Sequence, residues 1–170
     1  MSGHIRLIKT ADLAAVVAIQ ANCYGDELFE DASLIQKRLL SQPKSCWLAE
    51  SCSGEVLAYL FSYPSHNKQV AALGSEFSHY AGAELLYLHD MAVSQNARGL
   101  GLASRLLNCA ECYAMQLGFN RLALVAVQGS VPYWQKQGFA VVSLCDAEAL
   151  QALSSYTGQD ARYMQKSLAR

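Results

Sequence analysis

The sequence predicts a single α/β domain over residues 1–170, and three observations support this fold class. A chain of 170 residues has the length of one globular domain, and no linker or internal repeat divides it. Only 16% of its residues are charged, against about 25% in typical proteins, which suits a sheet whose central strands are buried on both faces. Strand and helix patterns also follow one another along the whole chain.

The N-terminal elements are expected to be a strand followed by two helices. The alternating pattern of residues 5–9 predicts the strand. Thr10 is expected to cap the first helix, and Gly25 ends it. A second helix is expected over residues 34–40, and it stops early because the residue before Pro43 avoids the α conformation.

The next segment is predicted to form a β-hairpin and a long loop. Strands are expected over residues 46–51 and 55–63, with the Ser53-Gly54 pair as the turn between them. Residues 64–83 mix polar, glycine and aromatic residues without a clear period, so we expect a loop with room for a short helix. Loops of this length in compact domains are usually functional or mobile.

The C-terminal half alternates strands and helices. Residues 85–93 form an apolar strand that carries His89 and Asp90. A helix is expected over residues 99–117, where apolar side chains recur on one helical face, and Gly118 is its C-cap. The remaining predicted elements are a strand, a short helix and two further strands, at residues 121–127, 131–137, 139–144 and 161–168.

The strand-to-helix segment at residues 91–103 has the features of an anion site. The first N–H groups of a helix lack internal partners, and the helix dipole adds partial positive charge there. Gly99 and Gly101 leave a phosphate free access to these groups, and Arg98 adds a full charge. Ser104 stands where a dinucleotide-binding fingerprint has its third glycine, and the ending of a P-loop is absent. Tight helix packing would explain a short Gly-x-Gly motif equally well.

Two motifs of this sequence resemble those of the GNAT superfamily of acetyl-CoA-dependent N-acetyltransferases. The family signature, Gln/Arg-x-x-Gly-x-Gly/Ala, follows a strand that ends in a hydrophobic-Ala-Val step. Here Met91-Ala92-Val93 is followed by residues 96–101, with Asn96 in place of Gln or Arg. A second family feature, two aromatic residues followed by three residues and Gly-Phe, is matched by residues 133–139.

The resemblance implies a mixed, mostly antiparallel sheet with helices on both faces. The strands through Asp90 and Val125 would splay apart at its centre and admit the pantetheine arm of acetyl-CoA. A backbone N–H near Val93 would polarise the thioester carbonyl, an oxyanion-hole role that lowers a barrier by about 3–4 kcal/mol when the donor is well placed. The residues implied in binding acetyl-CoA are Met91, Ala92, Val93, Arg98, Gly99, Leu100, Gly101, Leu102, Ala103 and Trp134.

His89 is the first candidate for the base that takes a proton from the acceptor amine. It precedes the implied acetyl-CoA contacts on the central strand, and histidine titrates in the useful range. Neighbours on a strand point to opposite faces, so Asp90 is not expected to act together with His89. A histidine held by buried hydrogen bonds is the competing interpretation, and Glu84 and Tyr87 are weaker candidates for the base.

Tyr133 is assigned as the acid that protonates the departing CoA thiolate. Many members of the family place a tyrosine at the second aromatic position of the short helix, where this chain has Trp134, which cannot serve as an acid. The alternatives are Ser130 as the acid, direct release of the thiolate, and a packing role for Tyr133.

An acidic cluster lies between the first two predicted helices. It consists of Asp26, Glu27, Glu30 and Asp31. In this family the region usually forms part of the acceptor pocket, and an acidic rim would attract a cationic amine. A solvated loop is the alternative, because charge runs on surfaces are common.

The six cysteines are expected to be reduced and mostly buried. Cys109 and Cys112 have the spacing of a zinc or redox pair. However, they lie mid-helix, and no second pair with metal-binding spacing exists, so we expect packing and predict no metal site.

Composition excludes several classes of protein. A net charge of −1 lacks the basic excess that nucleic-acid binding requires. The longest apolar runs are far shorter than the roughly 20 residues of a membrane-spanning helix. Asp12 interrupts the apolar stretch after the basic N-terminal residues, so a cytoplasmic location is favoured over secretion.

We therefore expect an enzyme that transfers an acetyl group from acetyl-CoA to a primary amine of a small molecule or peptide. The amine would attack directly, without a covalent enzyme intermediate and without a metal. The rival hypotheses are a catalytically silent CoA-binding sensor and an interaction module on the same fold, and a homodimer is a possible assembly.

Overall fold

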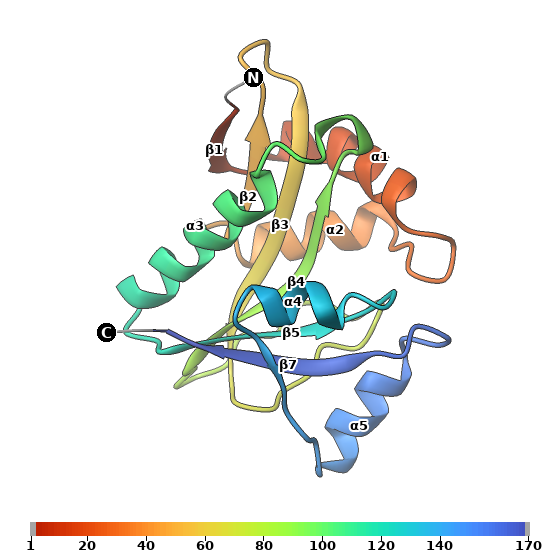
Figure 1. Cartoon of the computed structure of the whole chain (residues 1–170), viewed down its shortest axis with the longest axis vertical. Coiled ribbons are helices and arrows are strands. Elements are labelled where there is room, and N and C mark those ends of the chain that lie inside the picture. The colour runs from red at the N-terminus through yellow and green to blue at the C-terminus, as the bar shows by residue number, and fades with distance from the viewer. Residues whose placement is uncertain (1–2, 169–170) are drawn as a thin grey trace.

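The computed structural model describes residues 3–168, which form one seven-stranded sheet with strand order β1-β2-β3-β4-β5-β7-β6 (Figure 1). The strands are β1 (His4–Leu7), β2 (Cys46–Glu50), β3 (Val56–Ser65), β4 (Leu85–Val93), β5 (Arg121–Ala126), β6 (Ala140–Val141) and β7 (Arg162–Ser167). The α-helices are α1 (Leu13–Cys23), α2 (Ala32–Ser41), α3 (Leu102–Gln116), α4 (Val131–Lys136) and α5 (Ala147–Ser154). Strands β4 and β5 pair in parallel, whereas the other neighbouring strands pair antiparallel.

Helices cover both faces of this sheet. On one face, α1 and α2 bury Val16, Ile19 and Ile35 in a core that also contains the sheet residues Tyr59 and Tyr87. On the other face, α3 and α4 pack over a second core, formed largely by leucines and alanines. The expected fold class, a mixed and mostly antiparallel sheet with helices on both faces, is confirmed.

Helix α3 buries the face that its sequence pattern predicts. Leu102, Leu106 and Ala110 are buried against the sheet. The helix begins at Leu102, later than predicted, because Gly99 and Gly101 have φ angles of 82° and 74°. Such left-handed backbone cannot continue a right-handed helix, and glycine adopts it without steric cost.

The first strand and the first helix differ from the prediction at their shared boundary. Strand β1 ends at Leu7, and a 3₁₀ turn (Thr10–Asp12) precedes α1. Thr10 opens that turn and is not the cap of α1, because the helix starts only at Leu13. A 3₁₀ turn is a common way to enter an α-helix.

The C-terminal region contains the largest differences. The strand expected over residues 139–144 is reduced to Ala140–Val141, and helix α5 was not predicted. Asp146 caps α5, its carboxylate accepting a hydrogen bond of 3.0 Å from the N–H of Ala149. An aspartate before a helix-forming stretch is the signal that the sequence analysis missed. The loop between β3 and β4 contains turns and forms no helix.

The expectation that the cysteines are mostly buried is wrong. Cys46 is fully buried, and Cys23 and Cys109 are partly buried. Cys52, Cys112 and Cys145 are exposed. Among residues 3–168, none of the helices has both the length and the apolar character needed to cross a membrane.

Candidate active site

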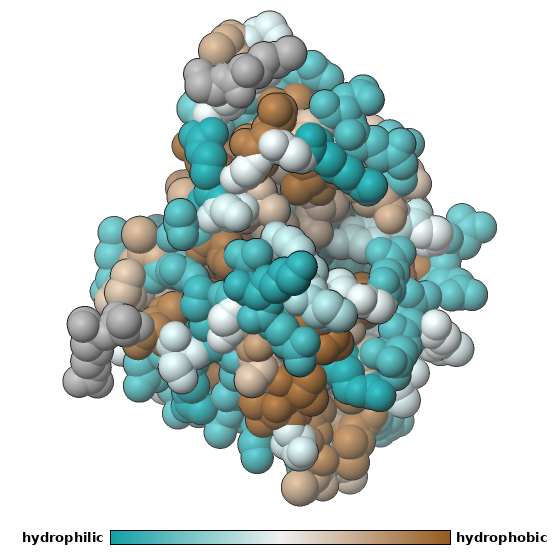
Figure 2. Space-filling view, viewed as in Figure 1, coloured by the Kyte–Doolittle hydropathy of each residue, from teal (hydrophilic) through white to brown (hydrophobic). Residues whose placement is uncertain are grey.

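Strands β4 and β5 separate in the middle of the sheet. Their pairing ends at Leu88 and Leu124, although β4 continues to Val93 and β5 to Ala126. A cleft of about 730 Å³ opens where they part. Figure 2 shows the surface hollowed above α4, with apolar side chains in the hollow. The expected splay at the centre of the sheet is confirmed.

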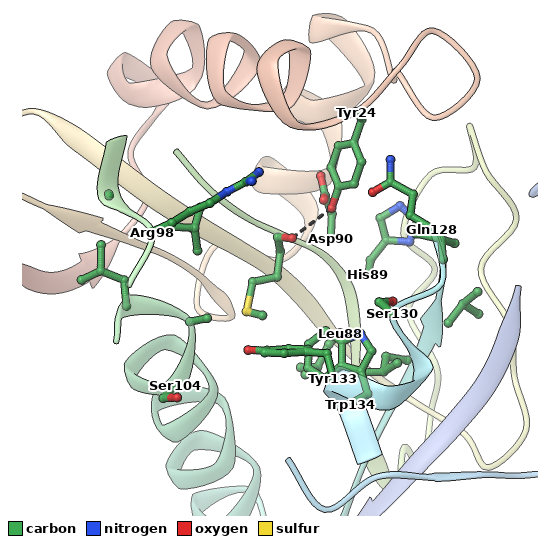
Figure 3. A pocket seen from close by; sticks show the side chains of 18 of the residues that line it. Tyr24, Leu88, His89, Asp90, Arg98, Ser104, Gln128, Ser130, Tyr133 and Trp134 are labelled. Carbon is green, nitrogen blue, oxygen red and sulfur yellow. Dashed lines mark hydrogen bonds between the residues drawn. The ribbon is translucent and has the colours of Figure 1, made fainter. Parts of the chain in front are cut away.

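The N-terminus of α3 forms one end of this cleft. Gly101 is the N-cap of the helix and offers no side chain. A Cβ atom at Gly99 or Gly101 would meet no other atom within 4 Å, so it would project into open space beside the helix end. Arg98 also lines the cleft (Figure 3). Free N–H groups, an uncovered helix end and a guanidinium together suit an anionic group such as a pyrophosphate.

Most of the residues implied in binding acetyl-CoA meet at the cleft. Those that line it are Met91, Val93, Arg98, Gly99, Gly101, Leu102, Ala103 and Trp134. Ala92 and Leu100 do not line it. The side chain of Ala92 is buried in the core on the α1 side of the sheet, and Leu100 is exposed beyond the cleft.

The cleft edge of β4 is held by the end of α1. The hydroxyl of Tyr24 donates to the carbonyl oxygen of Met91 at 2.9 Å, as the dashed line in Figure 3 shows. The thiol of Cys23 donates to the carbonyl oxygen of Val93 at 3.2 Å. A carbonyl oxygen has two lone pairs, so each of these groups can still accept a hydrogen bond from a ligand.

A β-bulge interrupts β4 at His89. Phe61 and Ser62 are neighbours on β3, yet their partners on β4 are Asp90 and Leu88, so His89 is an extra residue without a partner. A bulge of this kind changes which face the following side chains point to. Both His89 and Asp90 line the cleft, and the expectation that they point to opposite faces is therefore wrong.

His89 belongs to a buried ionic network. The guanidinium of Arg38 donates two hydrogen bonds of 2.6 Å to the carboxylate of Glu30 and two more to the carbonyl oxygen of Ser75. The N–H of Gly74 donates to Glu30 at 2.8 Å. Nε2 of His89 lies 3.1 Å from Oε1 of the same carboxylate. The network thus ties α2, the loop before it and the loop between β3 and β4 to the bulge.

These contacts indicate which nitrogen of the His89 imidazole carries a proton. Burial by itself raises the pKa of Glu30, but hydrogen bonds from His89 and Arg38 hold that pKa well below its ordinary value. The ionised carboxylate can only accept, so Nε2 of His89 carries the proton that it donates. Nδ1 is buried without a hydrogen-bond partner in the structure. In a neutral imidazole that nitrogen has a free lone pair and can accept a proton.

Asp90 is the second carboxylate at the bulge, and its residue is only partly buried. Its Oδ2 accepts a hydrogen bond of 2.8 Å from the hydroxyl of Tyr59. Burial raises the pKa of Asp90 above its ordinary value, although His89 and the Tyr59 hydrogen bond act in the opposite direction. Unlike Glu30, which Arg38 neutralises, Asp90 has a hydroxyl group rather than an arginine as its side-chain partner.

The lowered pKa of Glu30 leads to a prediction of how the stability of the protein depends on pH. A carboxyl group whose pKa is lowered by folding stabilises the protein above its unfolded pKa of about 4.3, and this contribution is lost as the pH falls through and below that value. At pH 7 we expect Glu30→Gln to lower the free energy of unfolding by about 1.5–3 kcal/mol, since charge-assisted hydrogen bonds are lost. At pH 3 the difference between variant and wild type should be smaller. Urea unfolding at the two pH values measures it, and an equal or larger difference at pH 3 contradicts the prediction.

The proposed acidic rim is only partly present. Glu30 is buried and paired with Arg38, so it is not a free surface charge. The carboxylate of Asp31 caps α2 through the N–H of Ser33. Glu27 accepts a hydrogen bond from Gln159, and both Glu27 and Asp26 are exposed. Glu30 thus lies near the cleft, as predicted from the sequence, but it is a buried ion and not a surface residue.

Helix α4 brings Tyr133, Trp134 and Ser130 to the cleft. The rings of Tyr133 and Trp134 meet edge to face at 5.0 Å, and Trp134 packs in the same way on Phe139 at 5.4 Å. Tyr133 is 39% exposed, and its partial burial raises the pKa of its hydroxyl. Trp134 is thus held by aromatic packing, while Tyr133 is an exposed residue at the wall of the cleft.

The sequence analysis did not identify Tyr24 and Gln128 as residues of the cleft. Tyr24 lies at the end of α1, and no local pattern indicates that its hydroxyl reaches β4. Gln128 has a φ of 55°, and such backbone in a residue other than glycine is often found at functional sites. Its position directly before Gly129, at the end of a buried strand, was the available signal.

Cys109 and Cys112 lie in the middle of α3, as expected. Between residues 3 and 168, no group of three or more His, Cys, Asp or Glu side chains has the arrangement of a metal site.

Comparisons with known proteins complete the description. The profile of the acetyltransferase (GNAT) family matches residues 13–139. Ard1 from Thermoplasma volcanium has a TM-score of 0.74 and 14% identity, with all of both chains covered. The GNAT-like decarboxylase GphF in complex with isobutyryl-CoA has a TM-score of 0.73 and 15% identity, over 98% of this chain and 100% of that chain. The GNAT family N-acetyltransferase YhbS from Escherichia coli in complex with CoA has a TM-score of 0.63 and 18% identity, over 98% of this chain and 82% of that chain. A comparison with curated protein sequences gave no match.

Proposed function

The chain belongs to the acetyltransferase (GNAT) family, and on this premise we propose that it transfers an acetyl group from acetyl-CoA to a primary amine. The acceptor is a small molecule or a peptide that attacks directly. The observation that carries the proposal is the cleft between β4 and β5, which runs from the open N-terminus of α3 to the adjacent residues His89 and Asp90 at the bulge. One site therefore combines an anion-binding end and a proton-accepting end.

The residues at the two ends of the cleft suit the two parts of CoA. The N–H groups after Gly101 and the guanidinium of Arg98 would hold the pyrophosphate. The edge of β4 at Met91 and Val93 would bind the amides of the pantetheine arm, and a backbone N–H near Val93 would polarise the thioester carbonyl. The volume of about 730 Å³ lies in the range of pockets that bind ligands of this kind, roughly 300–1,000 Å³.

The transfer requires a neutral amine, because an ammonium ion has no lone pair for attack. A typical alkyl amine has a pKa near 10, so a base must take its proton at pH 7. We assign this role to Nδ1 of His89, which has no hydrogen-bond partner, with Glu30 positioning the ring through Nε2. The neutral amine nitrogen then forms the bond to the carbonyl carbon and loses its second proton to water, while the carbon–sulfur bond breaks and the sulfur leaves as a thiolate. The products are the N-acetyl amine and CoA.

The thiolate benefits from a proton, and Tyr133 is the proposed donor. Tyr133 is exposed and lines the cleft. Trp134, at the position where the family usually has tyrosine, would pack against the bound CoA. Since Trp134 cannot donate a proton to sulfur, a CoA-binding sensor without turnover is the second candidate function.

Release of free thiol tests the two candidates. Acetyl-CoA is incubated with the protein and a panel of primary amines and peptides, and thiol is measured with a colorimetric reagent. We expect release that depends on both enzyme and amine, together with binding of CoA by calorimetry. CoA binding without thiol release by any amine would support the sensor, and loss of both would reject the two functions together.

A further inference from the structure

A small pocket lies behind the cleft, on the side of α1. Its volume is about 40 Å³, and it is lined by Tyr24, Leu28, Glu30, Leu73, His89, Asp90, Val125, Val127 and Tyr156. The cleft shares five of these residues, Tyr24, His89, Asp90, Val125 and Val127. The pocket is therefore an extension of the cleft beyond the bulge, and a group inside it would face His89 and Asp90.

The size and the walls of the pocket restrict what it can hold. A bound water needs about 10–15 Å³ of such volume, so the pocket has room for about three groups of that size. Four of the lining side chains are aliphatic, namely Leu28, Leu73, Val125 and Val127. An amino group and its first two carbon atoms fit these dimensions, and the remainder of the acceptor would extend into the cleft.

The charged side chains that line the pocket are either negative or already paired with a group of opposite charge. Among the lining residues there is no lysine or arginine. Glu30 is paired with Arg38, and His89 is hydrogen-bonded to Glu30 through Nε2. The carboxylate of Asp90 accepts from the Tyr59 hydroxyl. A partly buried carboxylate without a cationic side-chain partner is stabilised when a positive group approaches it.

The unpartnered Nδ1 of His89 is a second, independent sign of a ligand. The side chain of His89 is 2% exposed, and Nδ1 has no hydrogen-bond partner. Buried polar atoms without a hydrogen-bond partner are rare, and a bound ion or water molecule, local strain or a catalytic role accounts for those that occur. Asp90 and His89 both line this small space, and a primary ammonium there would offer three N–H donors to the carboxylate of Asp90 and to neighbouring acceptors.

We propose that this pocket binds the acceptor as an alkylammonium ion against Asp90, and that the acceptor carries no carboxylate beside its amino group. The proposal rests on the acetyltransferase function proposed above and adds the class of acceptor. A carboxylate on the first carbon would lie next to Asp90 and Glu30, with no lysine or arginine in the pocket wall to pair with it. Free amino acids are therefore rejected, whereas short aliphatic amines are accepted.

A matched pair of acceptors tests the proposal on the wild-type enzyme. 3-Methylbutylamine and leucine have the same carbon skeleton and amino group, and they differ by the carboxylate. Placing like charges together costs several kcal/mol, so we expect kcat/KM for the amine to exceed that for leucine by at least about 100-fold. Equal rates with the two acceptors overturn the inference and leave the acetyltransferase function standing. If neither these two acceptors nor any other amine releases thiol, the proposed function itself fails.

The Asp90→Asn variant tests the role of the carboxylate. Asparagine keeps an oxygen for the hydroxyl of Tyr59 but carries no charge. We expect kcat/KM for 3-methylbutylamine to fall about 10- to 100-fold, mainly through KM, and the preference for the amine over leucine to fall at least about tenfold. The matched control is Glu55→Gln, an exposed carboxylate that lines neither the cleft nor the pocket, and it should keep the wild-type preference. An unchanged preference in a folded Asp90→Asn protein that still binds CoA would overturn the assignment of Asp90.

Discussion

Gly101→Glu is expected to abolish binding of CoA, with a loss of affinity of at least about 1,000-fold. The new side chain would project from the N-cap of α3 into the space where we place the pyrophosphate, and its charge would repel the phosphates. Contact between the glutamate carboxylate and the phosphates of the pyrophosphate brings like charges together and costs several kcal/mol. Isothermal titration calorimetry with CoA measures the effect directly.

The control must separate this effect from strain in the backbone. Any residue with a Cβ is strained at the φ of 74° that Gly101 adopts, by about 1–2 kcal/mol. Gly118, which follows the other end of α3, has a φ of 80° and equal space around it. Gly118→Glu should therefore lower the stability to a similar degree and leave the affinity for CoA unchanged. Unaltered CoA affinity in Gly101→Glu would show that the pyrophosphate site is wrongly assigned.

His89→Gln is expected to lower kcat/KM for the amine by roughly 10²- to 10⁴-fold, the usual contribution of a general base. Glutamine can still donate to Glu30, but its amide cannot take up a proton near neutral pH. The fall in rate at acidic pH, where protonation blocks the lone pair of Nδ1, should disappear in the variant. The affinity for CoA should remain, because His89 lies at the acceptor end of the cleft. Steady-state rates from pH 5 to pH 9, together with calorimetry, measure these effects.

His79→Gln is the matched control for this substitution. His79 is exposed on the loop between β3 and β4, with a contact of 3.3 Å to Gln42, and it does not line the cleft. Its replacement should change neither the rate nor the pH profile. A His89→Gln enzyme that keeps the acidic fall near its original pH would remove His89 from the proton path and leave it a structural member of the ionic network.

The sequence predicted the end of the cleft at the N-terminus of α3 far better than the end at the bulge. Residues 91–104 form a continuous strand, turn and helix, so local rules for glycine and helix ends describe them directly. The end at the bulge is assembled from separate segments, such as Tyr24, Glu30, Leu73 and Asp90. No spacing rule connects these positions. The buried ion pair of Arg38 and Glu30 could not be predicted, for the same reason. Its two residues come from a helix and a loop whose sequence patterns indicate exposure to solvent.

The differences in the fold also have local physical causes. Helix α5 has only 8 residues, and its one buried residue is Ala149, so its apolar periodicity extends over too few turns to identify a helix, and the Asp146 cap is the clearest signal. The strand expected over residues 139–144 keeps only the pairs Ala140–Gln165 and Val141–Met164. Alternation in sequence predicts an extended backbone, but the pairing that defines a strand depends on a distant partner.

The extra residue at the bulge divides β4 into two halves of opposite parity. Before it, the even-numbered Leu86 and Leu88 point into the core beneath α3, and after it the odd-numbered Met91 and Val93 do so. Phe61 and Ser62 are consecutive on β3 and pair with Asp90 and Leu88, so removal of His89 would restore a single alternation and leave both halves facing the layers that they face now. The extra residue therefore turns neither half over. It places two consecutive titratable side chains, His89 and Asp90, on one face of the strand, which a regular alternation does not allow.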